Sequence, residues 1–273
     1  MNLALKVLDT IRKKLMLLFD TKKKPLKLLF DADMFVFRSC SVCETPIDWD
    51  CGITTLHCEH AEAEKIVDDT IMTITDRVLD HYKYTGEYEI LMCFSDPKEN
   101  FRKHILPTYK ANRVGKRKPL GYSKVVEWVQ KNYTCKQKPS LEADDCIGIL
   151  ATLNPYNSII ISGDKDFKSI PGHFYNFLSD TYYEISVTEA DYNHLYQTLI
   201  GDTADNYKGC PGVGAVTAKK ILDADPTWDA VVAQFAKKNL PSEDALIQAR
   251  VARILRNCDY DFAAKKPILW TPN

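Results

Sequence analysis

The chain has 273 residues, of which 45% are hydrophobic and 27% charged, so its composition is that of an ordinary globular protein. No stretch approaches the roughly 18 uninterrupted apolar residues of a membrane span, and we expect no membrane partner. The formal net charge of -1 neither favours nor excludes a nucleic-acid partner. Nine cysteines in an enzyme-sized chain without a secretion signal predict reduced thiols and a cytoplasmic location.

Residues 1–25 mix apolar side chains with lysine and arginine, which predicts an amphipathic helical extension lying on the domain. Asp9 and Asp20 argue against a transit peptide, because such peptides avoid acidic residues. A helix at a membrane surface is the alternative interpretation.

Beyond this extension, apolar runs of strand length alternate with apolar residues at helical spacing. The alternation predicts an α/β fold with a central, mostly parallel sheet flanked by helices. The last third is expected to be mainly helical, including Ser242–Arg256, after an irregular stretch from Asp180 to Asp191 with room for a strand near Tyr182–Ile185. The strands are expected at Leu26–Phe30, Glu89–Phe94 and Ser158–Ser162, and the helices between them at Glu62–Tyr82, Tyr122–Lys131 and Leu141–Leu153.

Every predicted strand runs into an aspartate. Asp31 and Asp33 follow the first strand, Asp96 the second, and Asp164 and Asp166 the third. Because the carboxyl ends of parallel strands lie at one edge of a sheet, we expect these side chains to converge there.

Two further acidic groups lie at the start of a predicted helix (Glu142, Asp144 and Asp145) and in a later turn (Asp202 and Asp205). Each group alone would be an ordinary turn or helix start. Two carboxylates about 4 Å apart repel by about 4 kcal/mol at an effective dielectric of about 20, so a larger gathering needs protons or cations. Hard divalent ions with oxygen ligands are the natural partner, and a pair of them suits phosphodiester hydrolysis.

A basic segment follows Asp96. Between residues 98 and 118 it interleaves aromatic rings with cations and contains the single acid Glu99. Basic side chains neutralise phosphates and rings stack on bases, although a charge run is also typical of a solvated helix face. The cations beyond Lys98 are Arg102, Lys103, Lys110, Arg113, Lys116, Arg117 and Lys118.

A glycine-rich turn, Gly209–Gly214, leads into a predicted helix at Ala215–Leu222. Glycines free the backbone, so that N–H groups and the helix N-terminus can face a phosphate. The pattern is typical of a helix–hairpin–helix or helix–three-turn–helix, and an ordinary loop is the alternative.

These residues resemble the flap endonuclease and 5′–3′ exonuclease superfamily from about Leu28 to Leu222, and are most similar to the short exonucleases of podoviruses. The motifs that carry the resemblance are LLFDAD, FSDPKENFRKHILPTYKANR, RKPLGY, LEADD, ISGDKDF, GDTADNYKGCPGVGAVTA and ARVARILRNCDYDF.

The resemblance implies a PIN-like nuclease core over residues 26–190, with a helical arch at about 97–120 and a helical DNA-binding region over residues 191–273. It implies two or more Mg²⁺ or Mn²⁺ ions, with K⁺ at the helix–three-turn–helix. Asp31, Asp96, Glu142, Asp144 and Asp145 match the first-metal group, and Asp164, Asp166, Asp202 and Asp205 the second. Lys110, Arg102 and Arg113 match catalytic cations. The expected DNA contacts are Tyr109, which would stack on the terminal nucleotide, Lys103, Lys116, Arg117, Lys118, Gly209, Gly212, Gly214 and Lys219.

The expected function is therefore exonuclease action at 5′ ends of duplex DNA, or on RNA in RNA–DNA hybrids, by a monomer in a host cytoplasm. A flap endonuclease, an inactive DNA-binding scaffold and a divalent-ion sensor are the alternatives. The stretch from Cys40 to His60 departs from the family pattern, but the spacing of its second pair does not favour zinc.

Overall fold

A six-stranded sheet forms the centre of the computed structural model, which describes residues 24–153, 155 and 157–272. The extension expected over residues 1–25 lies almost wholly outside the described residues. All three predicted strands are confirmed, and they are neighbours in the sheet. The strand order is β5 (Thr134–Lys136), β4 (Tyr88–Cys93), β1 (Leu26–Asp31), β6 (Ser158–Ser162), β7 (Gly172–Asn176) and β8 (Thr181–Ile185), of which only β8 is antiparallel.

Alternate residues of β1 enter two different cores. Leu28 and Phe30 pack with α2 (Ala32–Cys43), α3 (His60–Tyr82) and α5 (Tyr122–Asn132) on one face of the sheet. Leu29 packs with α6 (Ala143–Leu153) on the other face. A parallel sheet buried on both faces explains why its central strands appear in the sequence as mainly apolar runs.

The C-terminal helices form a further core of their own. The element α7 (Val187–Ile200) joins both parts, because Ala190 packs on the sheet core and Leu199 on the helical core. The stretch from Asp180 to Asp191 is therefore more regular than expected. The remaining helices are α8 (Ala215–Ala224), α9 (Trp228–Ala236) and α10 (Ser242–Ala252), and α10 ends four residues before the predicted Arg256. The predicted boundary near residue 190 stays a prediction.

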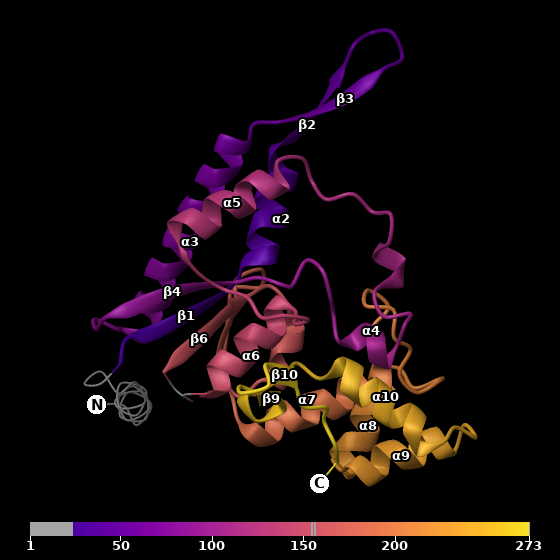
Figure 1. Ribbon diagram of the computed structural model, residues 1–273. Helices are drawn as coiled ribbons and strands as arrows, with labels where there is room; N and C mark the ends of the chain where they lie inside the picture. Colours follow the sequence, from indigo (N-terminus) through magenta and orange to yellow (C-terminus); the bar gives the residue numbers. More distant parts are fainter. Residues whose placement is uncertain (1–23, 154, 156, 273) are drawn as a thin grey trace, which may run out of the picture.

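Two segments leave the compact body. A hairpin of β2 (Glu44–Asp48) and β3 (Thr54–Cys58), which we did not predict, stands away from the sheet at the top of Figure 1. The basic segment arcs from the end of β4 to α5, and its regular structure is limited to α4 (Arg102–Ile105) and one 3-10 turn, η1 (Ala111–Arg113). In the described part of the chain, no helix is long and apolar enough to cross a membrane.

Candidate active site

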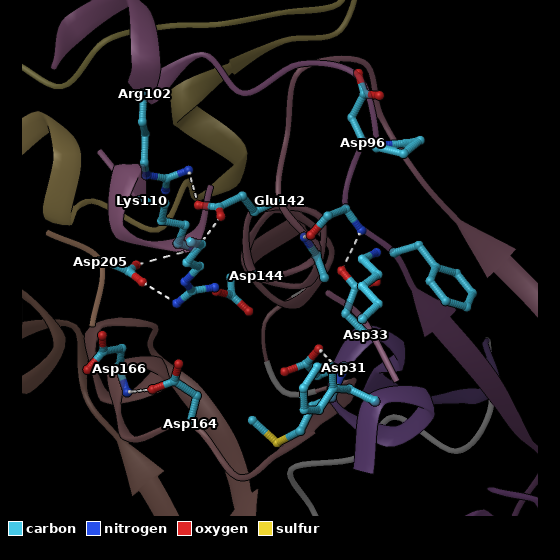
Figure 2. A pocket seen from close by; sticks show the side chains of 18 of the residues that line it. Asp31, Asp33, Asp96, Arg102, Lys110, Glu142, Asp144, Asp164, Asp166 and Asp205 are labelled. Atoms are coloured by element: carbon cyan, nitrogen blue, oxygen red, sulfur yellow. Dashed lines mark hydrogen bonds and ion pairs between the residues drawn. The ribbon is translucent and has the colours of Figure 1, made fainter. Parts of the chain in front are cut away.

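The strand ends bring the predicted aspartates to one edge of the sheet. Asp31 closes β1, where its Oδ2 accepts a hydrogen bond of 3.0 Å from the hydroxyl of Ser162 at the end of β6. Two residues later, Asp164 accepts the backbone N–H of Asp166 at 2.9 Å, which turns both side chains toward the same opening. With Asp144 from the first turn of α6, they line a cleft of about 900 Å³ (Figure 2).

We call Asp31, Asp144, Asp164 and Asp166 the cation-poor group, because no ion pair within the described residues includes them. Burial and then the charge of Asp33 raise the pKa of Asp31 to about 7. Burial and then Asp164 likewise raise the pKa of Asp166 to about 7. Burial, followed by Asp31 and Asp164, raises the pKa of Asp144 well above its ordinary value.

The other acids form a cation-paired group, which we define as Glu142, Asp145 and Asp205; Glu142 and Asp205 line the same cleft, whereas Asp145 is fully buried. Lys110 forms an ion pair with Glu142, and its Nζ lies 3.4 Å from Asp205 Oδ2. Arg113 Nη2 lies 2.6 Å from Asp205 Oδ1. Burial would raise the pKa of Glu142, but Lys110 and Arg102 outweigh it and hold that pKa at about 2.

The structure corrects the predicted roles of Asp145 and Arg102. Both oxygens of the fully buried Asp145 accept hydrogen bonds of 2.7 Å from the guanidinium of Arg102, and Oδ1 also accepts the N–H of Leu255. Asp145 is therefore committed to a buried ion pair and not to a metal. Arg102 is only 2% exposed and also contacts Glu142, so in this structure it holds that carboxylate in position.

The surroundings of Tyr109 also differ from those expected of a stacking ring, because its side chain is only 3% exposed in this structure. Its hydroxyl lies 2.8 Å from oxygens of both Glu142 and Asp205. The aromatic residue of the basic segment thus packs inward as part of the site's framework. A buried tyrosine needs a partner for its hydroxyl, and the two carboxylates supply it.

Two predicted ligands organise loops. Asp96 accepts backbone N–H groups of Ser140 at 2.7 Å and Lys98 at 2.9 Å, which lower its pKa, and Figure 2 shows it apart from Asp31 and Asp164. Asp202 similarly accepts the N–H of Ala204 at 2.6 Å. Burial raises the pKa of both Asp164 and Asp166, and Asp202 nevertheless lies close enough to them for its charge to raise the pKa of both further.

Asp33, which our predicted ligand set left out, lies in the cleft beside Asp31 (Figure 2). Its signal in the sequence was its two-residue spacing from Asp31, in the first turn of a helix.

The donors of the cation-poor group are all carboxylate oxygens, the ligands that hard divalent ions prefer. Crowded buried carboxylates with raised pKa values gain most from such ions, so the residues fit the expected metals. They surround an open cleft and do not form a closed cage: within the described residues, no group of three or more His, Cys, Asp or Glu has the geometry of a metal site. The same finding covers the stretch from Cys40 to His60, whose cysteines are free thiols.

The expected DNA contacts of the basic segment differ in their surroundings. Lys103 and Lys116 are exposed, and Lys116 lines the cleft. Arg117 forms a bidentate ion pair with Glu44 at the base of the hairpin. Lys118 Nζ lies 3.9 Å from the centroid of the Tyr122 ring. Arg117 and Lys118 are therefore held in place before any nucleic acid arrives.

The glycines of the turn before α8 have different tasks. Gly209 has a φ of +62°, and a Cβ there would lie 2.4 Å from the nitrogen of Gly201, so this glycine permits a close backbone contact. Its own N–H is bound to Gln248, which leaves no donor for a phosphate. Gly214 caps α8 without a side-chain hydrogen bond and faces open space, so the first N–H groups of that helix can meet an anion. Gly212, also at positive φ, and the exposed Lys219, which pairs with Asp223, lie nearby in the chain.

Comparison with known proteins gives consistent matches. Residues 27–192 match the model of the 5′–3′ exonuclease N-terminal resolvase-like domain. The exodeoxyribonuclease of Enterobacteria phage T3 is 32% identical, and the exonuclease of Escherichia phage T7 is 33% identical, each over 88% of this chain and 91% of the relative. The D15 flap endonuclease of bacteriophage T5, solved with DNA and metal ions, shares the fold at 14% identity, with a TM-score of 0.59 over 83% of this chain and 88% of that chain. The chain therefore belongs to the 5′–3′ exonuclease family of nucleases.

Proposed function

We propose that this nuclease hydrolyses phosphodiester bonds from the 5′ end of duplex DNA with divalent metal ions. The observation that carries the proposal is the cation-poor group, whose buried and half-buried carboxylates share one cleft. Such carboxylates must hold either protons or cations near neutral pH. Oxygen-only donors beside a basic segment favour a metal site that receives a phosphate.

Asp31, Asp144, Asp164 and Asp166 would hold two or more Mg²⁺ or Mn²⁺ ions. Glu142 and Asp205 lie at the rim of this group, and Asp96 and Asp202 would act through water. When bound, the ions would activate a water molecule and stabilise the charge that develops on the scissile phosphate and the departing oxygen. No nucleophilic side chain is needed for this reaction.

Lys110 and Arg113 would bind the scissile phosphate. Both cations already lie at the cleft, where they are held by Glu142 and Asp205. Metal ions near Glu142 and Asp205 would repel the positive charges of Lys110 and Arg113 and so weaken the ion pairs that hold these two side chains. The ammonium and guanidinium groups would then be free to contact the phosphate.

The duplex beyond the cleavage site would lie on α8. The open N-terminus of this helix offers N–H groups to a backbone phosphate, and a K⁺ ion there would add charge. The exposed lysines of the basic segment, Lys103 and Lys116, would hold the strand that enters the cleft.

Flap cleavage is the second candidate function. The basic segment arcs across the carboxyl edge of the sheet (Figure 1). Its Lys116 and Arg117 line the same cleft as Asp31. A single strand that enters from the side would meet these cations before it meets the acids. Action on RNA–DNA hybrids and a monomeric state stay predictions from the sequence.

The test compares blunt DNA, flapped DNA and RNA–DNA hybrid substrates with labelled 5′ ends, in Mg²⁺ and in chelator. We expect short 5′ products from blunt DNA in Mg²⁺ only. Asp164→Ala should abolish cleavage and leave DNA binding mostly intact. The matched control is Asp76→Ala, which changes an exposed acid on α3. Unchanged cleavage by Asp164→Ala, or cleavage in chelator, would contradict the metal assignment.

A further inference from the structure

Asp33 connects three segments that are far apart in the sequence. It lies in the first turn of α2, and its two carboxylate oxygens have different partners. Oδ2 accepts the backbone N–H of Ser95 at 3.0 Å, and Oδ1 accepts the hydroxyl of Tyr122, also at 3.0 Å. Figure 2 shows Asp33 beside Asp31, with its dashed bond to the neighbouring loop. Both oxygens are thus engaged by neutral donors of the protein.

One arm of this connection reaches the acids. Ser95 follows β4, and its hydroxyl accepts the backbone N–H of Ala143 at 3.0 Å. Ala143 is the first residue of α6 and lies between Glu142 and Asp144 in the chain. The first N–H groups of a helix have no partner within the helix, so this hydroxyl acts as a cap. Asp33 therefore holds the residue that fixes the start of α6.

The other arm reaches the basic segment. Tyr122 is the first residue of α5 and is 8% exposed. The Nζ atom of Lys118, the last cation of the basic segment, lies 3.9 Å from the centroid of the Tyr122 ring. The hydroxyl bond to Asp33 sets the position of this ring, and the ring in turn sets the position of the lysine.

We infer that Asp33 is a positioning residue that couples the metal-facing start of α6 to the carboxyl end of the basic segment. The inference rests on the proposed function in treating Glu142 and Asp144 as metal-facing. Its core claim is structural: loss of the Asp33 carboxylate loosens both segments at once. A metal ligand at this position would behave differently, because its negative charge would be essential.

The experiment compares Asp33→Asn with Asp33→Ala in the full chain. Asparagine keeps an oxygen for the Ser95 N–H, and its amide can donate to the Tyr122 oxygen, so the network survives without the charge. We expect Asp33→Asn to keep kcat and Mn²⁺ affinity within about threefold of the parent, and Asp33→Ala to lose about 10- to 100-fold in kcat, which is the usual cost of a lost supporting partner. Hydrogen exchange should quicken in Asp33→Ala for residues 114–121 and for the first turn of α6.

Asp164→Asn is the matched control, because a direct ligand should lose Mn²⁺ affinity on the same change. If Asp33→Asn loses as much Mn²⁺ affinity as Asp164→Asn, Asp33 is a ligand and the inference is wrong. Unchanged exchange in Asp33→Ala would also overturn it.

Tyr122→Phe provides a milder variant should Asp33→Ala fail to fold. It removes one arm only, so exchange should quicken in residues 114–121 and stay unchanged at the start of α6. Quickening at neither or at both segments would contradict the two-arm arrangement. Calorimetry with Mn²⁺ and hydrogen exchange need no cleavage, so they test Asp33 even if the parent protein fails to cut DNA and the proposed function falls.

Discussion

The cation-paired group and the cation-poor group contain the same kind of side chain in opposite electrostatic surroundings. The cation-paired group is neutralised by Lys110, Arg113 and Arg102, and the pKa of its Glu142 is held at about 2. Among the residues that the structure describes, no ion pair includes a member of the cation-poor group, and the pKa of Asp31 rises to about 7. The difference is sharpest at Asp144 and Asp145, adjacent residues that belong to opposite groups.

The comparison teaches that carboxylates in one cleft need not have one task. The carboxylates of the cation-paired group form ion pairs with the protein's own Lys and Arg side chains, which stabilise the fold and hold the basic segment in place. The carboxylates of the cation-poor group lower the stability of the metal-free protein, because burial and mutual repulsion both oppose their negative charge. A bound divalent ion offsets this destabilisation, so we expect the cation-poor group to be the one that binds metal.

The largest expected effect is that of Asp144→Asn. Loss of a metal ligand should lower kcat on a labelled duplex by at least about a thousandfold, which corresponds to several kcal/mol of lost charge stabilisation. In chelator the same change should raise the free energy of unfolding, because it removes a repelling charge. Cleavage near the parent rate would place Asp144 outside the metal site.

Asp145→Asn should act on the fold. It removes the bidentate charged partner of the buried Arg102, and we expect the free energy of unfolding in chelator to fall by about 3–5 kcal/mol. Urea unfolding followed by circular dichroism measures this. A variant as stable as Asp76→Asn would show that the ion pair does not support the structure.

Lys110→Met should lower kcat by about a hundredfold, the usual cost of removing one group that stabilises transition-state charge, and should change DNA affinity much less. The matched variant is Lys103→Met, which removes an exposed lysine that does not line the cleft and should weaken DNA binding more than kcat. If Lys110→Met weakens binding alone, Lys110 is only a contact to the DNA backbone.

The last expected effect is a dependence of stability on pH. The pKa of Asp166 is about 7 in the folded protein and 3.8 ordinarily, so between these values the folded state holds a proton that the unfolded state releases. This contribution to stability is present below about pH 4 and is lost as the pH rises through about 7. In chelator, Asp166→Asn should therefore become more stable relative to the parent over this range. A constant difference in unfolding free energy from pH 4 to 7 would contradict the raised pKa.

The sequence predicted the convergence of the acids because strand ends follow simple rules. Leu26–Phe30 and Ser158–Ser162 are short, mainly apolar runs, and parallel pairing brings the residues after them to one edge. Membership of the nuclease family also followed from the motifs at these strand ends.

What the sequence could not predict was which way each side chain faces. Asp144 and Asp145 share one acidic motif, and only the position of Arg102, 43 residues away in the sequence from Asp145, separates their roles. Tyr109 was expected to stack on a nucleotide because the short-range pattern is aromatic and basic, yet its partners Glu142 and Asp205 lie on other segments. Asp33 was overlooked for the same reason, since its contacts to Ser95 and Tyr122 are long-range.

The guanidinium of Arg102 has a consequence for the order of synthesis. It donates to the carbonyl oxygens of Val251 and Arg253, contacts that span 149 and 151 residues of the chain. A ribosome that has made only the sheet and the acids has not yet made these partners, and such distant contacts form late in folding. The cleft is therefore completed only when the C-terminal segment has emerged, so an unfinished nascent chain lacks an assembled nuclease site.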